Sequence, residues 1–320
     1  MTRAPGVFQH EPVLIDDVIG SLKPRDGGRY IDGTLGAGGY TRAILDAANC
    51  RVWAIDRDPD AISNATDIVR QYAGRLKVME GCFGEMAVLL PDHGQQVDGV
   101  TLDLGVSSMQ LDDGSRGFSF RHDGPLDMRQ GKCGRSAADV VNEADEAVLA
   151  DIIYRYGEER QARRIARAIS DVRANTLITR TSQLADIVRG AYRGRRDTAT
   201  DPATKTFQAI RIEVNDELGE LERGLRAAEI VLAPGGRLVL VSFHSLEDRI
   251  VKNFLRSRSG EKPAGSRHLP IHNTLISPPT FRLINRTVVK PSAAEIKHNP
   301  RSRSARLRVA ERLAATDSGS

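Results

Sequence analysis

The run Arg29-Tyr-Ile-Asp-Gly-Thr-Leu-Gly-Ala-Gly-Gly39 decides the fold. Its first four residues predict a short strand, the glycines predict a tight loop, and residues 40–48 have the apolar spacing of a helix. A second strand is predicted at residues 51–55, directly before Asp56. Glycines at a helix N-terminus let a ligand approach the backbone, and a carboxylate after the next strand can accept hydrogen bonds from two ribose hydroxyls. The pattern therefore predicts a cofactor that contains a nucleoside.

Strands and helices keep alternating beyond this unit. Further strands are predicted at residues 76–79, 97–102 and 237–243. Alternation on this scale indicates an α/β fold with a mostly parallel sheet and helices on both faces. A length of 320 residues fits two domains, or one large α/β domain that carries an insertion, and we expect the insertion.

The sheet pattern is interrupted in the middle of the chain. Helical segments are predicted there, and the one at residues 159–173 has arginines around its polar face. We expect residues 113–213 to form an inserted helical domain, and residues 1–112 and 214–320 to form the discontinuous α/β domain. Apolar residues then recur at helical steps over residues 204–232, which predicts one long helix.

The composition excludes several classes of protein. With 40% hydrophobic and 28% charged residues, the chain is not disordered, fibrous or a disulfide scaffold. No apolar run is long enough to cross a bilayer, so we expect a cytoplasmic protein without a membrane partner. The three cysteines share no CxxC spacing, and Pro270 separates His268 from His272. We therefore expect neither a disulfide partner nor a metal site.

Basic charge is concentrated in two stretches. From Arg249 to Ser320 there are 15 Lys and Arg against 4 Asp and Glu, and from Arg155 to Arg211 there are 13 against 6. Such regions suggest a polyanionic partner, most simply nucleic acid, although arginine-rich helices also serve as solvated faces.

The glycine loop favours one cofactor over others. A dinucleotide fingerprint would have a third glycine where this chain has Thr41, and no basic residue of a phosphate-binding loop follows. Asp32 ahead of the loop fits S-adenosylmethionine, whose methionine part carries an ammonium group. Two alternatives stay open: an NAD(P)-dependent oxidoreductase, which leaves the basic stretches unexplained, and a non-catalytic RNA-binding ribosome assembly factor.

Seven runs of sequence together resemble the ribosomal RNA small-subunit methyltransferase H family, also called MraW. They are Tyr30–Gly39, Ala54–Pro59, Leu102–Ser108, Pro125–Arg129, Lys205–Ile212, Ser242–Arg249 and Asn299–Ser304. The resemblance implies a class I, Rossmann-like methyltransferase fold with a helical insertion. It also implies N4-methylation of a single cytidine in the decoding region of 16S rRNA, within the small ribosomal subunit, with S-adenosylmethionine as donor. A homodimer is left open.

The resemblance also assigns cofactor contacts by motif position. They fall on Gly38, Gly39, Tyr40, Asp56, Phe83, Asp103 and Gln110. Tyr40 stands where the family usually has histidine: this departure changes little if position 40 contributes its backbone, whereas a side-chain role of the histidine does not carry over to it. Phe83 either packs on the adenine or belongs to the core.

The catalytic candidates follow from the chemistry of the target. The exocyclic amine of cytosine is a poor nucleophile, so the enzyme must orient it and accept its hydrogen bonds. We expect Asp103 and Ser107 to line the junction of donor and target. His244 follows a predicted strand and either contacts the target nucleotide or caps the turn, with Ser245 expected to cap the next helix. The expected contacts to the RNA backbone are Arg249, Arg301 and Arg303.

Overall fold

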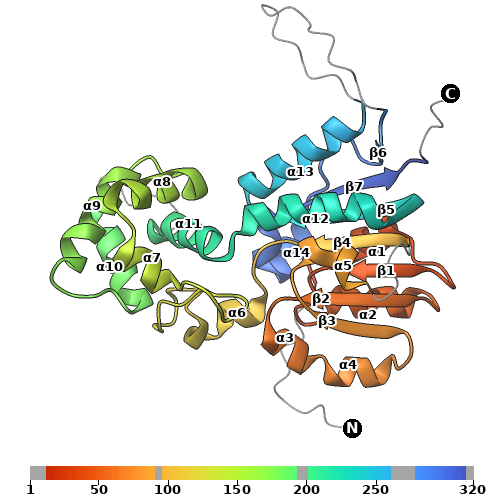
Figure 1. Ribbon diagram of the computed structural model, residues 1–320, viewed down its shortest axis with the longest axis horizontal. Helices are drawn as coiled ribbons and strands as arrows, with labels where there is room; N and C mark the ends of the chain where they lie inside the picture. Colours follow the sequence, from red (N-terminus) through yellow and green to blue (C-terminus); the bar gives the residue numbers. More distant parts are fainter. Residues whose placement is uncertain (1–11, 91–95, 193–200, 261–277, 315–320) are drawn as a thin grey trace, which may run out of the picture. The chain divides into compact units, whose positions relative to one another are not determined.

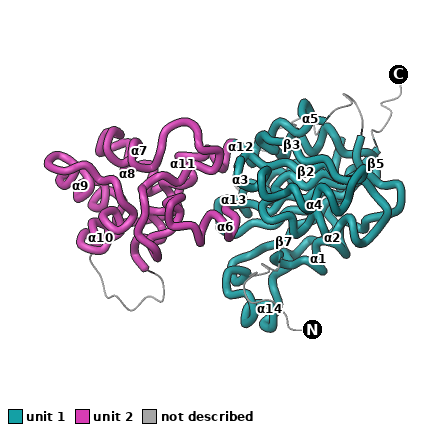
Figure 2. Tube along the Cα trace, turned by 90° about the horizontal axis from the view of Figure 1, so that it is seen from below, with its two compact units in different colours: residues 1–105, 220–320 teal, residues 106–219 magenta. Residues whose placement is uncertain are grey.

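The computed structural model describes residues 12–90, 96–192, 201–260 and 278–314 (Figure 1). They form two compact units, one of Met1–Gly105 with Glu220–Ser320 and the other of Val106–Gly219 (Figure 2). The inserted unit is thus longer at both ends than residues 113–213. It gains its first residues because Val106 and Leu111 pack against the core of the insertion.

A seven-stranded sheet with the order β3-β2-β1-β4-β5-β7-β6 organises the first unit. The strands are β1 (Arg29–Asp32), β2 (Arg51–Asp56), β3 (Leu76–Glu80), β4 (Val97–Asp103), β5 (Leu232–Ser242), β6 (Phe281–Leu283) and β7 (Arg306–Arg312). The first five pair in parallel, and β7 pairs antiparallel with both β5 and β6. The mostly parallel α/β sheet predicted from the sequence is confirmed.

Helices cover both faces of this sheet, as expected (Figure 1). Neighbouring strand residues point to opposite faces, since Tyr30 belongs to one core and Ile31 to the other. The first core is shared with α1 (Ile15–Leu22), α2 (Gly39–Ala47) and α4 (Thr66–Gln71). The second core is shared with α5 (Met86–Leu89), α12 (Glu217–Val231) and α13 (Ser245–Arg258). Two short helices complete the unit, α3 (Pro59–Asn64) and α14 (Ala293–His298).

The second unit is helical and has a core of its own. Its helices are α6 (Ser108–Asp112), α7 (Ala137–Glu143), α8 (Glu146–Gly157), α9 (Ala162–Arg173), α10 (Thr181–Ala191) and α11 (Ala203–Asn215). Ile153, Ile165 and Leu184 are fully buried in the shared core of α8, α9 and α10. None of the described helices in either unit is both long and apolar enough to cross a membrane.

The single helix expected over residues 204–232 is wrong. The chain forms α11 and α12, separated at Asp216, whose φ of 47° is left-handed. Aspartate tolerates this conformation better than most residues. The apolar stripe is continuous in sequence but serves two cores, because Phe207 packs in the second unit and Leu221 in the first.

Candidate active site

The loop between β1 and α2 owes its shape to glycines. Gly36 and Gly38 have φ values of 49° and 77°, which other residues rarely adopt, and Gly38 is the N-cap of α2. Gly39 is required for a different reason. A Cβ atom there would lie 2.2 Å from Cγ of Pro12, so the close neighbour of this glycine is another part of the chain.

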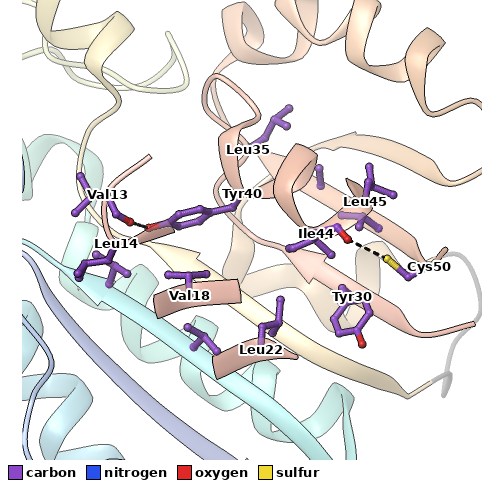
Figure 3. Packing of buried hydrophobic residues seen from close by; sticks show 14 of the residues in the cluster. Val13, Leu14, Val18, Leu22, Tyr30, Leu35, Tyr40, Ile44, Leu45 and Cys50 are labelled. Atoms are coloured by element: carbon purple, nitrogen blue, oxygen red, sulfur yellow. Dashed lines mark hydrogen bonds between the residues drawn. The ribbon is translucent and has the colours of Figure 1, made fainter. Parts of the chain in front are cut away.

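Tyr40 points away from the loop and into the core. Its side chain is 3% exposed, and its hydroxyl donates a hydrogen bond of 2.5 Å to the carbonyl of Val13 (Figure 3). Burial raises the pKa of this hydroxyl well above its usual range. A cofactor contact at position 40 therefore falls to the backbone, where the first N–H groups of α2 have no acceptor within the helix.

Asp56, at the end of β2, joins the loop to the strand. Its Oδ2 accepts from the N–H of Gly36 at 2.8 Å, and its Oδ1 accepts from the N–H of Asp58 at 2.9 Å. Burial raises the pKa of Asp56, although these two hydrogen bonds act to lower it. A carboxylate has about four acceptor positions, so two backbone bonds leave capacity for the two ribose hydroxyls of a nucleoside.

Two more carboxyl groups lie at the ends of β1 and β4, which are neighbours in the sheet. Asp32 is fully buried and accepts from Oγ1 of Thr41 at 2.6 Å and from the N–H of Thr34 at 3.2 Å. Burial raises its pKa to about 6 despite these bonds. Burial, followed by the charges of Asp32 and Glu247, raises the pKa of Asp103 well above its usual range.

Asp103 also has an unsatisfied oxygen. Its Oδ1 is buried and has no hydrogen-bond partner in the described part of the chain. No lysine or arginine there forms an ion pair with Asp32 or Asp103. Like charges this close raise each other's pKa, and a buried acceptor without a donor costs free energy. The pair is therefore suited to a ligand that brings a positive charge and hydrogen-bond donors.

Phe83 follows β3 in the short helix η1 (Phe83–Glu85). Its ring lies on α12, where a Cβ atom on Gly224 would be 2.3 Å from Cδ2 of Phe83. It packs against the core that α12 shares with the sheet. These contacts support the core interpretation, and the contact with adenine stays a prediction.

His244 caps α13, and the expectation that Ser245 would be the cap is wrong. Its Nδ1 accepts from the N–H of Glu247 at 3.3 Å, in place of a serine hydroxyl. The Glu247 carboxylate accepts in return from the N–H groups of Phe243 at 2.8 Å and His244 at 3.2 Å. Because Nδ1 accepts, the proton of the neutral imidazole is on Nε2, which lies 3.1 Å from Oε1 of Glu247 without hydrogen-bond geometry.

Glu247 is the residue of this site that sequence reasoning missed. It is 2% exposed, it holds His244 at the end of β5, and its charge raises the pKa of Asp103. The signal was the glutamate three positions after a cap, which is typical of a capping box. With a cap at Ser245, the residue three positions later is Asp248 rather than Glu247.

The remaining candidates lie elsewhere in the two units. Ser107 and Gln110 belong to the second unit and form the capping box of α6: the Ser107 side chain accepts from the Gln110 N–H at 3.2 Å, and Oε1 of Gln110 accepts from the Ser107 N–H at 3.0 Å. Arg249 is exposed on α13, and Arg301 and Arg303 lie in η3 (Pro300–Ser304). Their functional roles stay predictions. His268 and His272 lie outside the described residues.

Comparisons with known sequences identify the family of this chain. A model of the MraW methylase family matches residues 7–313. The chain belongs to this family. It is 61% identical over 307 residues to the ribosomal RNA small subunit methyltransferase H of Rhodospirillum centenum, covering 96% of this chain and 93% of that protein. The corresponding protein of Rhodospirillum rubrum is 55% identical over 307 residues, covering 95% and 94%. A solved structure of an rRNA methylase from Streptococcus thermophilus overlaps with a TM-score of 0.42 at 9% identity, over 94% of each chain.

Membership of the MraW methylase family sets the oxidoreductase alternative aside and makes S-adenosylmethionine the cofactor. The residues present fit this group. Its ammonium and sulfonium charges would compensate the acid pair of Asp32 and Asp103, whereas the phosphates of a dinucleotide would be repelled. Asp56 would hold the ribose, and the loop backbone around Gly38 would line the rest of the site.

Proposed function

We propose that this MraW-family methylase transfers the methyl group of S-adenosylmethionine to the N4 amine of one cytidine in the decoding region of 16S rRNA. Two relatives that are 61% and 55% identical carry the name ribosomal RNA small subunit methyltransferase H, which supports rRNA of the small subunit as the substrate. The observation that carries the chemistry is the buried, unpartnered Oδ1 of Asp103 at the end of β4.

In the proposed mechanism, Asp103 binds the target amine and accepts its proton. S-adenosylmethionine supplies an electrophilic methyl group and leaves as S-adenosylhomocysteine. Oδ1 of Asp103 accepts a hydrogen bond from the amine, which orients its nitrogen toward the methyl carbon. As the N–C bond forms, the amine loses one proton. A raised pKa makes the Asp103 carboxylate a stronger base for that proton than an ordinary aspartate.

His244 and Ser107 are supporting candidates in this proposal. Glu247 fixes the imidazole of His244 with its proton on Nε2, so this nitrogen can donate a hydrogen bond to the target nucleotide. The hydroxyl of Ser107 accepts from the Gln110 N–H and keeps its own proton for donation. We assign RNA recognition to the inserted helical unit. Arg249, Arg301 and Arg303, which belong to the first unit, are further candidate contacts to the RNA backbone.

The test is a transfer assay on small ribosomal subunits from cells that lack this gene. Purified protein and labelled S-adenosylmethionine are added, and the modified nucleoside is mapped by nuclease digestion and mass spectrometry. We expect N4-methylcytidine at one position of the decoding region. Tight cofactor binding without transfer to subunits, naked RNA or assembly intermediates would favour the non-catalytic assembly factor.

The variant Asp103→Asn tests the residue that carries the proposal. It keeps the shape of the side chain but removes the basic oxygen, so we expect turnover to fall by about 100-fold or more. The measurement is single-turnover methyl transfer, with cofactor affinity determined separately by calorimetry. Full turnover with unchanged cofactor affinity would remove Asp103 from both of its roles.

A further inference from the structure

Many arginines of the second unit are held by acidic partners. Six of them lie within 3.4 Å of a carboxylate oxygen in the described part of this unit. The pairs are Arg129–Asp127, Arg135–Glu143, Arg155–Asp151, Arg180–Asp123, Arg189–Asp201 and Arg211–Glu217. The exposed pairs among them, such as Arg135–Glu143 and Arg155–Asp151, are common on solvated faces and contribute little to stability. Arginines of this unit without a carboxylate partner are therefore the exceptions that need an explanation.

Three arginines at the beginning of α9 differ from these pairs. The side chains of Arg160, Arg163 and Arg164 have neither an ion pair nor a hydrogen bond to any described residue. Arg160 and Arg163 are exposed, and Arg164 is half-buried. Arg167 follows one turn later, is 74% exposed, and is 3.7 Å from Glu146. Four positive charges therefore share one short segment of the surface, where the neighbouring acids are Glu146, the exposed Glu158 and the buried Glu159, which pairs with Lys205.

Packing does not account for these side chains. The core contacts of α9 come from its opposite face, where Ile165, Ala166 and Ile169 are fully buried. Nor does local helix stability account for them. The first turn of α9 carries no acid, and its N-cap Gln161 makes no side-chain cap bond; the nearest acid is Glu159, which accepts from the Gln161 N–H at 2.8 Å just before the helix. Positive charges at this end of a helix oppose its dipole, so the arginines reduce helix stability here.

We infer that Arg160, Arg163, Arg164 and Arg167 form a surface that binds the phosphate backbone of the substrate RNA. The inference rests on the proposed function, because it takes RNA as the partner. Guanidinium groups without internal partners are free to make charge-assisted hydrogen bonds to phosphate oxygens. The unfavourable interaction of these arginines with the helix dipole is offset when phosphate groups of the RNA bind to them.

The test compares two double variants that remove the same charge from the same unit. Arg160→Gln with Arg163→Gln removes unpaired arginines, and the matched control, Arg135→Gln with Arg155→Gln, removes paired and exposed ones. Both are measured on the full chain with a fluorescent 16S decoding-region RNA over a series of KCl concentrations. We expect the α9 variant to lose about tenfold or more in affinity and to flatten the salt dependence by about 0.7 in log–log slope per lost contact. The control should remain close to wild type.

Thermal unfolding provides a second readout. We expect the melting temperature of the α9 variant to be equal to or above that of wild type, because charges that oppose the helix dipole have been removed. A lowered melting temperature together with weakened RNA binding would assign these arginines a structural role and overturn the inference. The charge-conserving variant Arg160→Lys with Arg163→Lys should keep the wild-type salt slope.

The outcomes also separate this inference from the proposed function. A wild-type protein that methylates the subunit, beside an α9 variant that matches the control in RNA affinity and slope, overturns only the inference. A wild-type protein with neither salt-dependent RNA binding nor methyl transfer overturns both. Unchanged S-adenosylmethionine affinity in every variant is expected, since the substitutions lie outside the proposed cofactor site.

Discussion

At the scale of single residues, Asp32 links cofactor binding to pH. Its pKa is raised to about 6 in the folded protein, against about 3.9 for an unfolded chain. The folded state therefore holds the extra proton between about pH 4 and pH 6, and Asp32 lowers stability as the pH rises through that window. A cationic ligand favours the ionised form. We expect the affinity for S-adenosylmethionine to increase from pH 5 to pH 7, with release of a proton near pH 6.

Calorimetric titrations in two buffers with different heats of protonation measure this release directly. The observed binding heat should differ between the buffers near pH 6 and agree between them near pH 8. An affinity that stays constant from pH 5 to pH 7, with no exchange of protons, would show that Asp32 does not face the charge of the cofactor.

Some positions of single residues could be predicted from the sequence and others could not. The positions of Asp32, Asp56 and Asp103 at strand ends followed from the alternation of strands and helices, which a short apolar pattern reveals. The inward direction of Tyr40 and the cover of Pro12 over Gly39 did not follow, because both depend on a segment that returns from outside the loop. Contacts with segments that are distant along the chain do not produce a periodic pattern in the sequence, so they cannot be predicted from it.

At the scale of elements, an acidic residue of α13 ties that helix to β7. Asp248 accepts from Nε of Arg308 at 2.6 Å and from Nη1 of Arg306 at 2.9 Å. Burial raises the pKa of Asp248, but these hydrogen bonds outweigh it and hold the pKa below its usual value. The stability it provides is therefore present above about pH 4 and is lost as the pH falls through its folded pKa.

We expect Asp248→Ala to lower the free energy of unfolding by about 3 kcal/mol at pH 7, because Arg308 would keep a mostly buried charge without its partner. Urea unfolding measures this cost, and the gap to wild type should narrow below about pH 4. Arg282→Ala is the control, since its 62% exposed side chain pairs with Glu311 at the surface and should matter by less than about 1 kcal/mol. Equal effects of the two variants would contradict the role of Asp248.

The elements show a second limit of prediction. The strands β1 to β4 were predicted to within one residue at each end, because buried parallel strands are continuous apolar runs. β5 was predicted from residue 237 but begins at Leu232, and β7, an antiparallel strand with alternating arginines, was missed. The division between α11 and α12 was missed. The apolar residues before Asp216 pack in the core of the second unit, and those after it pack in a core of the first unit. The helical spacing of apolar residues in the sequence does not show which core each of them joins.

At the scale of the whole molecule, the two units have separate hydrophobic cores. A ligand stabilises the state that binds it, by about 2.7 kcal/mol at 100 times its Kd. We expect saturating S-adenosylmethionine to slow amide hydrogen exchange around β1, β2 and the start of α2 by up to about 100-fold, and to leave α8, α9 and α10 nearly unchanged. Mass spectrometry of peptides from both units measures this. Equal slowing of amide hydrogen exchange in the two units would show that they unfold cooperatively as a single unit.

The interrupted sheet has a consequence during synthesis on the ribosome. β4 lies in the middle of the finished sheet, but its neighbour β5 follows it by roughly 130 residues, so at about 5 to 20 residues per second β4 waits about 6 to 25 s for that partner. Until then a long apolar strand presents an unpaired edge, which is the kind of surface that drives aggregation. The nascent chain is therefore most prone to aggregation through this edge while residues 106–219, the helical unit, are being made.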